Sequence, residues 1–166
     1  MTTLHYFAYG SNMSSRRMQA RLPAATVVAT ATLDGYRLAM HKVGRDGSAK
    51  CDALAVDDPK ARLHGVLYRI AAAERARLDD CEGLGDGYRD ATVEVRLGDG
   101  RRVAAFLYIA TRTNPRLRPF DWYKTHVLHG AREHHLPDDY LVTLAALDSV
   151  PDPDPVRSAA ELAIYR

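Results

Sequence analysis

The sequence predicts an α+β domain of mostly antiparallel strands that closes towards a small barrel, with helices at its margins. Two patterns carry this prediction: β-rich runs with apolar residues at alternate positions, and segments with apolar residues at helical spacing. Their order is a strand, a short helix, several strands, a helix, a hairpin and two helices. The 166 residues fit one domain, which we place at residues 1–150, followed by a C-terminal tail at residues 151–166.

The N-terminal half begins with an aromatic-rich strand from Leu4 to Tyr9 that ends at Gly10. A short helix follows from Ser14 to Arg21, with Asn12 or Ser14 as its N-cap. Asp34-Gly35 is a good hairpin signal between two β-rich runs, so we expect those runs to pair. The predicted strands of this half continue at Thr26–Leu33, Tyr36–His41, Ala53–Val56 and His64–Ile70.

The C-terminal half begins with a strong helix-forming segment from Ala71 to Glu82, whose inward stripe is Ala71, Leu78 and Cys81. Glu82 lies at the edge of this stripe and at the helix C-terminus, where the helix dipole disfavours an anion. The remaining predicted elements are strands at Ala91–Leu97 and Val103–Ile109, a helix ended by Leu136-Pro137, and a last helix capped by Asp138 or Asp139. One face of the first of these helices is marked by Phe120, Tyr123, Val127 and Ala131.

The charge and cysteine content restrict the class of protein. The net charge is +2 and the basic residues are dispersed, which predicts no nucleic-acid partner. Two cysteines cannot form a secreted disulfide framework, and we find neither a signal-peptide pattern nor an apolar run of about 20 residues. These features predict a cytoplasmic protein without membrane contact. Its tail packs either on the body or on a second subunit, which would make the protein a homodimer.

Two segments could carry chemistry. Tyr9-Gly10-Ser11-Asn12 joins a strand to a helix N-terminus, where outward backbone amides can form an anion or oxyanion cradle. The alternative is a plain turn with a capping side chain. Glu82 can be a sheltered general acid/base, and the alternative is a solvated carboxylate at a frayed helix end closed by Gly83.

A metal site is disfavoured by the histidine spacing. His126, His129, His134 and His135 belong to one predicted helix, without a zinc-binding spacing and without a cysteine pair. We therefore predict that these histidines are solvated. A serine nucleophile elbow and the glycine-rich nucleotide-binding motifs are also absent.

Three motifs in order resemble the γ-glutamylcyclotransferase family. The first is Phe-Ala-Tyr-Gly-Ser-Asn-Met at residues 7–13, and the second is Leu-Asp-Asp-Cys-Glu-Gly at residues 78–83, followed by Tyr88. The third runs from Tyr123 through Gly-Ala-Arg-Glu to Leu-Pro and Tyr140. The first motif alone is weakly specific, but the three together in register form a strong signature.

This resemblance implies a barrel-like fold and an enzyme that releases 5-oxoproline from a γ-glutamyl compound by internal cyclisation. It implies Glu82 as the catalytic acid/base, a substrate pocket at Tyr9, Gly10, Ser11 and Asn12, and Tyr88 and Tyr123 as further lining residues. No metal or cofactor is implied, because the nucleophile belongs to the substrate. Three alternatives stay open: a γ-glutamylamine cyclotransferase, an enzyme that removes a γ-glutamyl cap from a biosynthetic intermediate, and a ligand-binding protein on the same fold.

Overall fold

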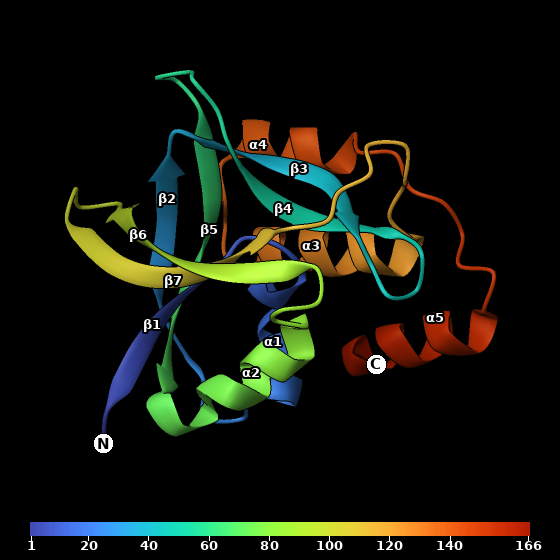
Figure 1. Cartoon of the computed structure of the whole chain (residues 1–166), viewed down its shortest axis with the longest axis horizontal. Coiled ribbons are helices and arrows are strands. Elements are labelled where there is room, and N and C mark those ends of the chain that lie inside the picture. Colours follow the sequence, from blue (N-terminus) through green and yellow to red (C-terminus); the bar gives the residue numbers. More distant parts are fainter.

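The computed structural model describes residues 1–166 and contains a closed five-stranded barrel and a separate two-stranded sheet (Figure 1). The barrel order is β1-β5-β2-β6-β7, and β3 pairs with β4 in the second sheet. This arrangement confirms the predicted α+β barrel. The strands are β1 (Thr3–Ala8), β2 (Thr26–Asp34), β3 (Tyr36–Val43), β4 (Ala49–Ala55), β5 (Arg62–Ala71), β6 (Tyr88–Leu97) and β7 (Arg102–Ala110).

The barrel is antiparallel except where it closes. β1 pairs with β5 along its whole length, and Tyr6 of β1 meets Phe106 of β7 in parallel register. The rings of Tyr6 and Phe106 stack with centroids 5.2 Å apart, so an aromatic contact supports this short closing pair. Phe7, Leu67 and Leu107 come from these three strands and are fully buried in the common core.

The predicted pairing across Asp34-Gly35 is wrong. Gly35 is the single residue between β2 and β3, and a two-residue loop is the shortest usual hairpin connection. β2 already has β5 on one side and β6 on the other, so both of its edges are occupied. The chain turns at Gly35, where φ is +80°, and β3 leaves the barrel to pair with β4.

The helices lie below and to the right of the barrel strands in Figure 1, and none of them combines the length and apolar character that a membrane span requires. Ser14 caps the first helix by accepting a hydrogen bond from the Arg17 amide, which confirms one of the two predicted caps. The α-helices are α1 (Ser15–Arg21), α2 (Arg75–Glu82), α3 (Asp121–Glu133), α4 (Asp138–Ala145) and α5 (Pro155–Leu162), with short 3₁₀ turns η1 (Ser11–Met13), η2 (Ala72–Glu74) and η3 (Ala163–Tyr165).

Two details of the helices differ from the sequence prediction. Cys81 is exposed, so Leu78 is the inward residue of the last turns of α2. Pro137 is the N-cap residue of α4, and neither Asp138 nor Asp139 caps this helix with its side chain. Both aspartates lie in the first turn, where their charge complements the positive end of the helix dipole.

The C-terminal segment ends in a helix at the lower right of Figure 1, and its side chains join a polar network with residues of α1 and α3. Tyr165 donates a hydrogen bond to Ser14 Oγ over 2.8 Å, and its hydroxyl lies 2.7 Å from His126 Nδ1. Glu161 accepts from Arg17 at 2.5 Å and lies 3.1 Å from His126 Nε2. The prediction of solvated histidines is therefore wrong for His126, which is fully buried among these partners.

Replacing Glu161 by Gln is expected to weaken the fold by about 1 kcal/mol at neutral pH, because the pair with Arg17 is partly exposed. Burial opposes ionisation of Glu161, but the hydrogen bond to His126 and the charge of Arg17 lower its pKa from 4.5 to about 2. Because the pKa of Glu161 is lower in the folded protein than in the unfolded chain, its ionised carboxylate stabilises the fold at a pH above the unfolded pKa of about 4.5. This contribution to the free energy of unfolding is lost as the pH falls from about 4.5 towards 2. Urea unfolding at pH 7 and at pH 3 checks this prediction. The difference in the free energy of unfolding between wild type and E161Q should be smaller at pH 3, and an equal difference at both pH values contradicts it.

Candidate active site

Close backbone contacts fix the loop at residues 9–12. The loop leaves β1 and enters η1, where Ser11 and Asn12 are both buried. A Cβ atom on Gly10 would lie 3.0 Å from Cys51 Cβ, and one on Gly130 of α3 would lie 2.3 Å from the Ser14 backbone nitrogen. The glycine at Gly10 therefore lets β4 pack directly against this loop, and the glycine at Gly130 lets α3 pack against the two residues that follow it.

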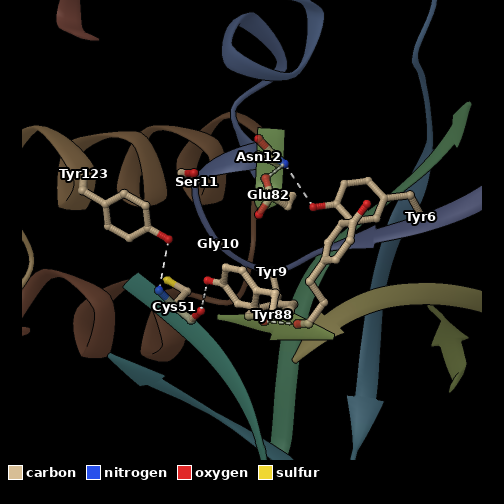
Figure 2. Close-up of a pocket in the computed structure, with 10 residues that line it drawn as sticks. Tyr6, Tyr9, Gly10, Ser11, Asn12, Cys51, Glu82, Tyr88 and Tyr123 are labelled. Carbon is tan, nitrogen blue, oxygen red and sulfur yellow. Dashed lines mark hydrogen bonds between the residues drawn. The ribbon is translucent and has the colours of Figure 1, made fainter. Parts of the chain in front are cut away.

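Glu82 is the last residue of α2, and its carboxylate points towards the loop (Figure 2). Asn12 Nδ2 donates to Glu82 Oε1 over 2.7 Å and to the Tyr6 hydroxyl over 3.1 Å. Arg21, the last residue of α1, donates to Asn12 Oδ1 over 3.0 Å and forms an ion pair with the same Glu82 oxygen. The guanidinium of Arg21 thus compensates the unfavourable position of a carboxylate at a helix C-terminus.

Tyrosine rings from four elements surround this carboxylate. Tyr123 accepts a hydrogen bond from the Cys51 amide over 3.0 Å, and Tyr88 donates to the Cys51 carbonyl over 2.5 Å. Tyr9 donates its hydroxyl to the backbone carbonyl of Tyr108. The tyrosine hydroxyls therefore hold β4 and β7 in place, while the rings form the wall of a pocket that Glu82 enters (Figure 2).

The buried hydroxyls and the thiol of this pocket stay protonated at neutral pH. Burial raises the pKa values of Tyr9, Tyr88 and Tyr123 well above 10, and nearby ionisable groups reinforce the shift. Burial also raises the pKa of the Cys51 thiol to about 12. Since the thiolate is the reactive form of cysteine, Cys51 is a poor nucleophile here.

All seven residues singled out in the sequence line this one pocket: Tyr9, Gly10, Ser11, Asn12, Glu82, Tyr88 and Tyr123. Sequence reasoning missed Tyr6, Cys51 and Tyr108, which complete the lining, and Arg21, which pairs with Glu82. The alternate-residue pattern of β1 places Tyr6 on the same face as Ala8, a weak signal. Nothing local in the sequence indicates the partnership of Arg21 with Glu82, because the two residues are 61 positions apart.

The comparisons with known proteins point to one family. The family model described as gamma-glutamyl cyclotransferase, AIG2-like, matches residues 6–125. A gamma-glutamylcyclotransferase from Mus musculus is 28% identical over 150 residues, which cover 88% of this chain and 79% of that protein. A gamma-glutamylcyclotransferase from Homo sapiens is 28% identical over 147 residues, which cover 86% of this chain and 78% of that protein.

The fold agrees with this assignment. A solved structure of a gamma-glutamyl cyclotransferase superposes with a TM-score of 0.89, covers 99% of both chains and is 24% identical in sequence. At that identity the likeness shows a shared fold, and the family assignment rests on the match over residues 6–125. The family resemblance read from the three motifs is thereby confirmed: the chain belongs to the gamma-glutamyl cyclotransferase, AIG2-like family.

Proposed function

We propose that this protein releases 5-oxoproline and a free amine or amino acid from a γ-glutamyl compound by intramolecular cyclisation, with Glu82 as general acid/base. The observation that carries the proposal is the Glu82 carboxylate, held by Asn12 and Arg21 at the wall of a tyrosine-lined pocket. Glu82 is the one carboxylate that lines this pocket. A single carboxylate is sufficient for a reaction in which the protein's chemical role is proton transfer. The substrate supplies both the nucleophile and the electrophile.

The proton transfers follow from this placement. The substrate α-amine attacks its own δ-carbonyl carbon, which forms the C–N bond of a five-membered ring. Glu82 accepts the proton that the attacking nitrogen loses, and then donates it to the leaving nitrogen as the original amide bond breaks. Ring closure within one bound molecule needs no second reactant. Most of the entropy cost of aligning the amine with the carbonyl is therefore met when the pocket binds the substrate.

Asn12 and Arg21 position the base in this mechanism. Their donors both contact Oε1, so the hydrogen bond and the ion pair fix the orientation of the carboxylate and leave Oε2 without a hydrogen bond from either. The backbone amides of Gly10, Ser11 and Asn12 would hold either the developing oxyanion or the substrate α-carboxylate. One oxyanion donor is typically worth about 3 kcal/mol of barrier.

The test is 5-oxoproline release by the purified protein from γ-glutamyl-alanine, glutathione and γ-glutamyl-lysine. We expect release from at least one of them, and the preferred substrate identifies the leaving group. Preference for γ-glutamyl-lysine would favour the γ-glutamylamine alternative. Absence of release from all three, with calorimetry showing that 5-oxoproline and the dipeptides bind, would support a binding protein on this fold and contradict the proposed reaction.

A further inference from the structure

A second, wider cavity opens directly from the tyrosine-lined pocket. Ser11, Glu82, Tyr88 and Tyr123 line both cavities, so Glu82 stands at the boundary between them. If the γ-glutamyl group occupies the inner pocket, the bond that breaks lies beside Glu82 and the leaving group extends into the outer cavity. In that placement the side chains of the outer cavity would decide which leaving groups bind well.

The outer cavity is lined by five cationic side chains, and four of them already have a carboxylate partner. The exception is Lys42 on β3, which forms no ion pair and whose Nζ atom donates no hydrogen bond within the protein. The four pairs are Arg17 with Glu161, Arg21 with Glu82, Arg45 with Asp86 and Lys50 with Asp46.

Lys42 is nevertheless buried, with only 5% of its surface exposed. Its Nζ atom lies 4.5 Å from the centre of the Tyr88 ring, a cation–π contact at the boundary of the two cavities. A Cβ atom on Gly87 would lie 2.8 Å from Lys42 Cε and 3.0 Å from Nζ, so the glycine provides the room that the ammonium occupies. Burial lowers the pKa of Lys42, while the negative charge of Glu82 opposes that shift.

We propose that Lys42 binds a carboxylate on the leaving group and thereby selects γ-glutamyl compounds whose leaving amine is an amino acid over those whose leaving amine is uncharged. This inference rests on the proposed function and adds a specificity-determining residue to it. The Lys42 side chain is almost wholly buried and its ammonium, which faces the outer cavity, has no anionic partner, so an incoming carboxylate compensates it with a charge-assisted hydrogen bond. A neutral leaving group cannot do so.

The matched substrates are γ-glutamyl-alanine and its C-terminal amide, which differ only in the charge of the leaving group. Wild type should prefer the acid by about 10- to 100-fold in kcat/KM, the range of a hydrogen bond between charged groups. K42M should remove most of this preference by lowering kcat/KM for the acid and sparing the amide. The change should appear mainly in KM, because the contact is the same in the ground state and the transition state.

Two further variants distinguish recognition from structural support. K42R keeps the positive charge and should retain a preference for the acid. K60M removes the charge of an exposed lysine outside both cavities and should leave the ratio unchanged. An equal loss of kcat/KM for both substrates in K42M would overturn the proposal. It would mean that Lys42 supports the fold or contacts the γ-glutamyl part of the substrate, not the leaving group.

Direct binding separates this proposal from the proposed reaction. The acid and the amide are titrated by calorimetry into E82Q and into E82Q with K42M. We expect E82Q to bind the acid at least tenfold more tightly than the amide, and the double variant to bind both alike. Equal binding by E82Q overturns the role of Lys42 even if wild type releases 5-oxoproline. Failure to release 5-oxoproline with the binding difference intact overturns the reaction alone.

Discussion

The E82Q variant should lose 10²- to 10⁴-fold in kcat for 5-oxoproline release, the usual contribution of a general acid/base. Glutamine has the shape of glutamate and keeps an oxygen that Asn12 and Arg21 can reach, so the pocket should stay intact. It cannot accept the proton of the attacking amine at neutral pH. We therefore expect KM to change much less than kcat, as measured by steady-state kinetics with γ-glutamyl-alanine.

The matched control is E94Q, which removes the same charge from an exposed position on β6. It should retain wild-type activity, and thermal unfolding of both variants checks that each one is folded. Near-normal turnover by a folded E82Q protein would falsify the assignment of Glu82 as the proton carrier. The search for a base would then move to the other ionisable groups of the two cavities.

The G130A variant should be destabilised by about 3 kcal/mol, the upper end of what overpacking a core usually costs. The added methyl group would lie 2.3 Å from the Ser14 nitrogen, 2.4 Å from the Met13 carbonyl carbon and 2.6 Å from Met13 Cβ. Two of these atoms are backbone, so the obstruction cannot be relieved by rotating a side chain. The higher helix propensity of alanine, about 1 kcal/mol relative to glycine, offsets only part of the cost.

Because Met13 and Ser14 directly follow the loop at residues 9–12, the same change should also lower activity. Urea unfolding measures the stability and 5-oxoproline release measures the activity. G98A is the matched control, since a Cβ atom there meets nothing within 4 Å and the backbone φ is not positive. If G130A proves as stable as G98A, the close approach of α3 to the loop is not a constraint on the fold.

Much of the fold could be predicted because the signals are local. Alternating apolar residues in β6 and the helical spacing of α3 depend on neighbours along the chain, and both elements are present where the sequence placed them. The pairing of β2 and β3 could not be predicted in the same way. Asp34-Gly35 does turn the chain, but β2 pairs instead with β5 and β6, which lie much later in the sequence.

The residues of the site also differ in how far the sequence predicts them. The loop at residues 9–12 and Glu82 belong to sequence motifs, so they could be predicted as site residues from the sequence. Arg21 and Lys42 belong to no motif, and their importance depends on which charges lie near them in space. His126 shows the converse error: its type and spacing indicated a solvated residue, but the C-terminal segment buries it.

The path of the chain through the barrel also determines the order in which its parts can fold during synthesis. β1 closes the barrel against β7, about a hundred residues later, and Tyr165 reaches back to Ser14 across 151 positions. The first motif therefore leaves the ribosome long before its structural partners exist. Contacts of such long sequence separation slow folding. A nascent chain should consequently become competent to bind substrate only after β7 has closed the barrel and α3, which supplies the pocket residue Tyr123, has docked.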